Sequence, residues 1–124
     1  MVKLLLIDDS PFTLRRHVEL VQALGCEAIA AKSGDEAIAL FAQRLPELVL
    51  CDIMMPEMDG YEVLEALQGI QANLQFYFVS GEMTEEIQRK ARSLGAKGVI
   101  EKPLQLEVLK KICQNLCSRE KSNL

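Results

Sequence analysis

The sequence predicts an α/β protein built on a doubly wound parallel sheet. Along its 124 residues, short apolar runs alternate with longer amphipathic stretches, so strands and helices should follow each other in turn. The first, third and fourth apolar runs are nearly continuous, which is typical of strands covered by helices on both faces. Because crossovers between parallel strands are right-handed, this alternation places helices on both sides of one sheet.

Five apolar runs have the length of a strand. The predicted strands are Val2–Ile7, Cys26–Ala31, Glu47–Cys51, Gln75–Val79 and Lys97–Ile100. A helix follows each strand, which gives a (βα)5 repeat with no internal linker. At this length the common strand order is 2-1-3-4-5, the flavodoxin-like arrangement, whose binding crevice lies outside the carboxyl ends of strands 1 and 3.

The first two helices have clear start signals. Ser10 and Pro11 provide an N-cap and a first-turn proline. Ser33, with Glu36 three residues later, predicts a capping box. Gly25 stands where the first helix should end. The apolar faces of the two helices repeat at helical spacing: Leu14, Val18 and Val21, then Ala37, Ile38 and Phe41.

The last three helices follow similar patterns. Asp59 and Glu62 predict a second capping box at the start of the third helix. Thr84 precedes two glutamates, which the dipole of the fourth helix favours, and Gly95 stands at its expected end. The fifth helix has an apolar face made of Leu109, Ile112, Cys113 and Leu116.

The net charge of −4 argues against direct nucleic-acid binding, because modules that bind nucleic acid usually carry a basic excess. The charge is uneven, at −6 in residues 1–62 and +2 in residues 63–124. This asymmetry is compatible with a cation in the acidic half or with ordinary solvated helix faces. No apolar stretch approaches the ~20 residues of a membrane span, and no signal peptide is recognisable, so we expect a cytoplasmic location.

Several residues with reactive side chains are expected to be structural. The four cysteines lack CxxC spacing, and we interpret them as packing residues in a reducing compartment. They are Cys26, Cys51, Cys113 and Cys117. A zinc site is not expected, since only one histidine accompanies them. That histidine, His17, is predicted to lie on the surface of the first helix. The loop methionines Met54, Met55 and Met58 are predicted to contribute packing.

Polar side chains gather at the predicted crevice. Asp8 and Asp9 follow the first strand, and Asp52, Ser80 and Lys102 follow the third, fourth and fifth. Three carboxylates so close together would repel one another, and a hard divalent cation such as Mg²⁺ or Mn²⁺ would relieve that repulsion. A carboxylate can attack a phosphoryl group and form an acyl phosphate. We therefore predict that Asp52 is a phosphoacceptor, with Lys102 and Ser80 contacting the phosphoryl group.

These residues form a recognisable set of motifs: Asp8-Asp9, Asp52-Ile53-Met54-Met55-Pro56, Asp59-Gly60, Ser80-Gly81 and Lys102-Pro103. In this order they resemble the CheY-like response regulator receiver domains of two-component systems, and the resemblance covers nearly the whole chain. It implies that Asp52 is phosphorylated and that Asp9, Asp52 and the backbone carbonyl of Met54 bind the metal. It also implies that Asp8 acts through metal-bound water.

The resemblance further implies roles for the later motifs. Lys102 would pair with the phosphoryl group, Ser80 would move toward it, and the peptide bond before Pro103 would be cis. The sequence departs from many relatives at Val99, where they carry an aromatic residue that moves inward on activation. This departure puts the usual aromatic response in doubt, but not the phosphorylation.

The implied protein is a phosphoacceptor switch that catalyses only its own phosphorylation and dephosphorylation, and not an enzyme acting on other substrates. The donor would be a phosphohistidine on a sensor histidine kinase or a histidine phosphotransfer protein. The sequence identifies neither the kinase nor the output protein, and a homodimer through the fourth and fifth helices is one option. We expect a receiver domain at residues 1–118 and a short polar tail at residues 119–124, either as a free-standing protein or as part of a larger regulator.

Two other classes remain as alternatives. A flavodoxin would share the fold, but would need a loop rich in Ser, Thr and Gly after the first strand, where this chain has Asp8 and Asp9. A phosphatase of the haloacid dehalogenase type would also use an aspartyl nucleophile, but would need a second acid at the position of Met54. A bound yellow chromophore would favour the flavodoxin, and steady turnover of phosphate esters would favour the phosphatase.

Overall fold

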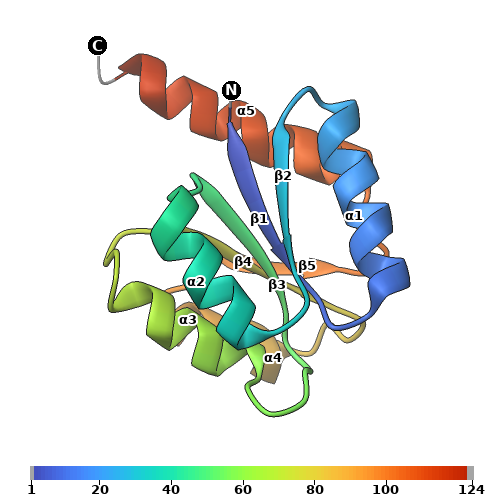
Figure 1. The fold of residues 1–124 in the computed structure, drawn as a ribbon, viewed down its shortest axis with the longest axis vertical. Helices are drawn as coiled ribbons and strands as arrows, with labels where there is room; N and C mark the ends of the chain where they lie inside the picture. Colours follow the sequence, from blue (N-terminus) through green and yellow to red (C-terminus); the bar gives the residue numbers. More distant parts are fainter. Residues whose placement is uncertain (1, 123–124) are drawn as a thin grey trace.

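The computed structural model describes residues 2–122, with side chains described through residue 116. The strands are β1 (Lys3–Ile7), β2 (Glu27–Ala31), β3 (Leu48–Asp52), β4 (Gln75–Ser80) and β5 (Gly98–Glu101). The helices are α1 (Pro11–Ala23), α2 (Gly34–Arg44), α3 (Gly60–Gln68), α4 (Glu85–Ser93) and α5 (Leu106–Ser122). All neighbouring strands pair in parallel in the order β2-β1-β3-β4-β5, so the predicted fold class and strand order are confirmed (Figure 1).

The sheet separates two hydrophobic cores. On one face, the strands pack against side chains of α2, α3 and α4 such as Phe41, Leu64 and Ala91. On the other face, they pack against side chains of α1 and α5 such as Leu14 and Leu109. This layering explains why the first, third and fourth strands are apolar almost throughout. It also brings the carboxyl ends of β1, β3, β4 and β5 to one edge of the sheet.

The strand ends differ from the predicted ones by about one residue, and the difference matters for the site. Asp52 pairs with Val79 and Ser80 pairs with Glu101, so both polar residues are the last residues of their strands and not the first of a loop. The predicted strands ended at the last apolar residue, one position before Asp52 and one before Ser80. In the structure, the pairing between neighbouring strands continues for one more residue and fixes the positions of both.

The helix starts follow the predicted N-caps. Ser10, Ser33, Asp59 and Thr84 each accept a hydrogen bond from the backbone of the first helical turn. The capping box of Asp59 and Glu62 is complete, whereas at Ser33 only the bond from the Glu36 backbone is present among the described residues. Gly25 and Gly95 have positive φ angles just after α1 and α4, as expected for helix ends.

Helix α5 continues to Ser122, so it includes residues 119–122 of the expected polar tail, and the domain boundary at residue 118 stays a prediction. Residues 123–124 of the expected tail, and the side chain of Cys117, lie outside the described residues. No helix in the described part of the chain is long and apolar enough to cross a membrane.

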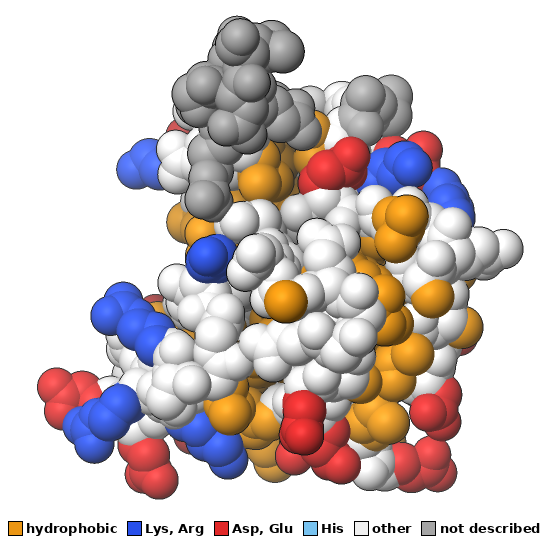
Figure 2. Space-filling model, turned by 90° about the vertical axis from the view of Figure 1, so that its left-hand side faces the viewer, with side chains coloured by type: hydrophobic (Ala, Val, Ile, Leu, Met, Phe, Trp, Pro, Cys, Tyr) orange, Lys and Arg blue, Asp and Glu red, His pale blue; other side chains and the backbone are white. Residues whose placement is uncertain are grey.

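Two side chains lie where the sequence interpretation did not place them. His17 is buried, with only 4% of its surface exposed, and is not a surface residue. Met54 is 80% exposed and does not pack in its loop, although Met55 and Met58 contact the core. Acidic side chains lie along the lower rim of the molecular surface in Figure 2, with Lys and Arg side chains among them on the left.

Candidate functional site

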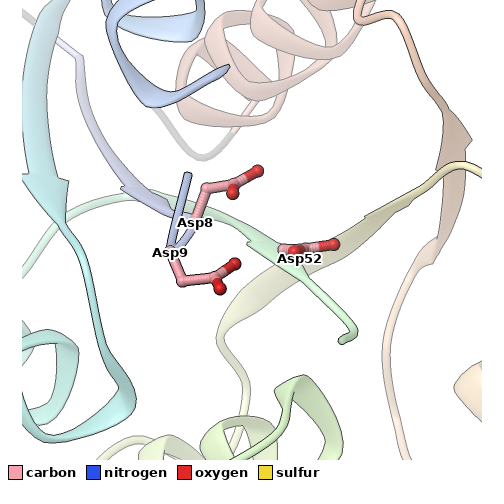
Figure 3. A group of neighbouring side chains, drawn as sticks. All are labelled: Asp8, Asp9 and Asp52. Atoms are coloured by element: carbon pink, nitrogen blue, oxygen red, sulfur yellow. The ribbon is translucent and has the colours of Figure 1, made fainter. Parts of the chain in front are cut away.

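Three carboxylates meet at the carboxyl edge of the sheet. Asp8 and Asp9 follow β1, Asp52 ends β3, and their side chains point into the same space (Figure 3). One carboxylate oxygen from each of the three lies within 4.8 Å of the other two. The structure thus brings together the three acidic residues that the sequence predicted as metal ligands.

The three carboxylates differ in their surroundings. Asp8 is buried, and its two oxygens accept hydrogen bonds from the Ser10 backbone at 2.9 Å and from Lys102 Nζ at 3.1 Å. Asp9 is exposed. Asp52 is half-buried and accepts a second bond from Lys102 Nζ at 3.2 Å. Because both oxygens of Asp8 already have partners in the protein, Asp9 and Asp52 are better placed to bind an ion directly.

Lys102 links the two sides of the site. Its ammonium group bridges Asp8 and Asp52, while its backbone N–H donates to the carbonyl of Ser80 at 2.8 Å. Burial alone would lower the pKa of Lys102, but the hydrogen bonds and charges of Asp8 and Asp52 outweigh it and raise the pKa. Lys102 therefore stays protonated. The peptide bond between Lys102 and Pro103 is cis, the geometry that the family resemblance implied.

The electrostatics of the site fit a divalent cation. Burial raises the pKa of Asp52, and the charge of Asp8 raises it further, so the pocket resists the ionised form of Asp52 despite Lys102. Three carboxyl groups share a small space with one ammonium group, that of Lys102. Carboxylate oxygens are hard ligands, which Mg²⁺ and Mn²⁺ prefer, so the residues present fit the predicted cation.

A close backbone approach holds the loop after β3. Gly60, the first residue of α3, donates its N–H to the carbonyl of Ile53 at 2.8 Å. A Cβ atom at Gly60 would lie 2.4 Å from the backbone oxygen of Asp52, closer than packed atoms allow. The glycine of the Asp59-Gly60 motif therefore lets the start of α3 pack directly against the end of β3.

The remaining predicted residues lie in β4, in β5 and in the loop that follows β3. Ser80 is 8% exposed at the end of β4, and its hydroxyl oxygen accepts from the Glu82 backbone at 3.1 Å, which leaves its proton available to donate. Val99 is partly buried in β5, opposite Phe78 in the strand register, and contacts the core. Met54 lies two residues after Asp52 in the loop that leads to α3.

The sequence interpretation missed His17 as a neighbour of the site. His17 lines a groove of about 440 Å³ together with Phe12, Leu104 and Lys102, the lysine that contacts both aspartates. Burial lowers the pKa of His17, which favours the neutral imidazole. His17 lies at helical spacing from Leu14 and Val21, the other buried residues of α1, and this spacing could have predicted its burial. The polarity of histidine led instead to the prediction of a surface position.

Comparison with known proteins agrees with this geometry. The response regulator receiver domain family matches residues 4–114. The chain is 32% identical over 106 residues to the chemotaxis protein CheY of Bacillus subtilis, which covers 85% of this chain and 88% of that protein. It is 27% identical to the sensor histidine kinase RcsC of Salmonella typhimurium over 86% of this chain, but over only 11% of that larger protein.

A solved structure supports the same relationship. The CheX-CheY-BeF3-Mg complex from Borrelia burgdorferi contains a chain that is 28% identical to this one, with a TM-score of 0.84 over 91% of this chain and 87% of that one. The family match spans most of the sequence, and the strand order and the acidic edge agree with it. This chain belongs to the response regulator receiver domain family of two-component systems.

Proposed function

We propose that the protein is a phosphoacceptor switch in which Asp52 receives a phosphoryl group from the phosphohistidine of a sensor histidine kinase or a histidine phosphotransfer protein. The observation that carries the proposal is the contact of one ammonium group, Lys102 Nζ, with both Asp8 and Asp52 beside the exposed Asp9. A phosphoryl group on Asp52 would meet this cation at once. Membership of the receiver family supports the same assignment.

In the proposed reaction, a carboxylate oxygen of Asp52 attacks the phosphorus, the bond from phosphorus to the donor nitrogen breaks, and an acyl phosphate forms. Lys102 would exchange its bond to Asp52 for one to a phosphoryl oxygen, and Ser80 would donate its hydroxyl proton to another. Asp9, Asp52 and the Met54 carbonyl would hold Mg²⁺ or Mn²⁺, with Asp8 acting through water, and the ion would neutralise phosphoryl charge.

A phosphotransfer screen tests whether a sensor kinase donates the phosphoryl group to this chain. Each sensor kinase of the source organism, autophosphorylated on histidine, is mixed with this chain and Mg²⁺, and loss of label from the kinase is followed over time. One kinase should transfer far faster than the others. Transfer from none of them, combined with failure of acetyl phosphate to label the chain, would contradict the proposal.

We also propose bounds, an output and a cellular location for the switch. Its domain would occupy residues 1–118, and it would pass its signal to an unidentified output protein without contacting nucleic acid. We place it in the cytoplasm, because thiols such as those of Cys26 and Cys51 persist in a reducing compartment. Self-association through α4 and α5 remains a prediction that sedimentation with and without beryllofluoride can test.

The switch would also catalyse its own dephosphorylation, and Met54 should limit that reaction. Hydrolysis needs a water in line with the phosphorus, and a thioether offers only a weak acceptor to hold one. Because the Met54 side chain is exposed, it can be replaced without disturbing the core. We expect Met54→Asn to shorten the lifetime of the acyl phosphate severalfold. Met54→Leu is the apolar control, and equal lifetimes in the two variants would exclude this role.

Phosphorylation should move the segment that follows Ser80 more than it moves Val99. The Ser80 hydroxyl gains a charged acceptor only in the phosphorylated state, so its movement would pull residues 81–94. Val99 is stiff at χ1 and should keep one rotamer. With beryllofluoride and Mg²⁺, backbone NMR shifts should change most in residues 81–94, and the Val99 methyl shifts should change little. Large methyl changes at Val99 beside an unshifted α4 would contradict this prediction.

A further inference from the structure

Helix α4 is weakly buried and is tied to α3 by two side-chain contacts. Only Ala91 is buried among the residues of α4, whereas α3 has four buried residues. At the C-terminal end of α4, Gln68 Nε2 donates to the carbonyl of Leu94 at 2.7 Å. One turn earlier, the ammonium group of Lys90 lies 4.1 Å from the centre of the Tyr61 ring. The apolar packing of α4 comes from Ala91 and the partly buried Ile87, and these two contacts add to it.

The two contacts differ in how easily they can break. A Cβ atom at Gly95, whose φ is +99°, would lie 2.6 Å from Gln68 Nε2, so the chain is shaped to let the amide approach. The Gln68 contact is therefore a firm attachment. Lys90 is exposed, and a cation–π contact at an exposed site contributes only about a two- to fivefold change in an equilibrium.

The Tyr61 ring also contacts the strand that carries Ser80. Its centre lies 5.0 Å from that of Phe78, which in turn packs edge-on against Phe76. Phe78 precedes Ser80 by two residues on β4, so the two side chains share one face of the sheet. Phe78 is also the register partner of Val99 on β5. Tyr61 thus contacts both α4 and the core beside this position.

We propose that Lys90 and Tyr61 form a latch that holds α4 in its unphosphorylated position, and that α4 pivots about the Gln68–Leu94 contact when the latch opens. Tyr61 and Lys90 are positioning residues, because they act on Ser80 only through α4 and β4. The proposal rests on the proposed phosphoacceptor function.

The test compares the affinity for beryllofluoride, in the presence of Mg²⁺, among variants of the full chain. Lys90→Met removes the cation and keeps a straight side chain, so it should open the latch and tighten beryllofluoride binding about two- to fivefold. Lys90→Arg keeps a cation over the ring and should bind like the unmodified protein. Arg89→Met, on the same helix, makes the same change in net charge without a ring contact and is the matched control.

NMR of the Lys90 side chain provides the direct readout. Its methylene protons next to the ammonium group should be shifted upfield by the Tyr61 ring, and this shift should disappear when beryllofluoride saturates the protein or when Tyr61 is replaced by leucine. A persistent ring shift in the saturated protein, or equal affinities for Lys90→Met and Arg89→Met, would overturn the latch alone. Absence of beryllofluoride binding in the unmodified protein would instead overturn the proposed function, and the latch with it.

Discussion

Asp52→Asn should abolish the incorporation of a phosphoryl group from acetyl phosphate in the presence of Mg²⁺. The unmodified protein should gain one phosphoryl group per chain, measured by intact mass spectrometry, whereas an amide offers no carboxylate oxygen to form an acyl phosphate. We expect a loss of at least a hundredfold in the labelling rate. The effect is large because it removes the attacking atom and not merely a contact to it.

Two controls make this result specific to Asp52. Asn is nearly the same size as Asp, and Asp52 lies next to the buried Cys51, so circular dichroism should verify that the variant folds. Asp59→Asn, in the same loop region but outside the carboxylate cluster, should still be labelled. Labelling of Asp52→Asn at the rate of the unmodified protein would assign the acceptor to another residue.

The second large effect concerns the metal. Asp9→Ala should weaken Mg²⁺ binding roughly a hundredfold, whereas Asp8→Ala should weaken it about tenfold, as expected for a residue that acts through an intermediate partner. The structure supplies the reason for this order. Both oxygens of Asp8 already accept bonds within the protein, from Ser10 and Lys102, whereas Asp9 is exposed beside Asp52.

Isothermal titration with Mg²⁺, repeated with Mn²⁺, measures these affinities. Asp35→Ala, an exposed acid in the first turn of α2, is a control for the general loss of negative charge and should change the affinity little. Unchanged affinity in both Asp8→Ala and Asp9→Ala would remove the acidic cluster from metal binding. A larger loss for Asp8→Ala would reverse the assigned order.

Local patterns made much of this protein predictable from its sequence. Alternating apolar runs and the handedness of crossovers predicted a parallel sheet with helices on both faces, and helix starts followed from single residues such as Ser10 and Thr84. The strand order was predicted as the common arrangement for a chain of this length. These signals are local, because capping and periodic burial depend on neighbours within a few residues. Motif spacing also indicated that Asp8, Asp9 and Asp52 would meet, since the carboxyl ends of parallel strands share one edge.

Tertiary structure decided how these residues meet and which neighbours they have. The bond from Lys102 to Asp8 joins residues 94 positions apart, and no local pattern gives its length or shows that Lys102 also contacts Asp52. Burial of His17 and exposure of Met54 likewise depend on what packs across from each residue. The contact of Lys90 with Tyr61 depends on how closely α4 approaches α3. Sequence periodicity identifies the buried face of each helix, whereas distances between helices are set only when all the side chains pack together.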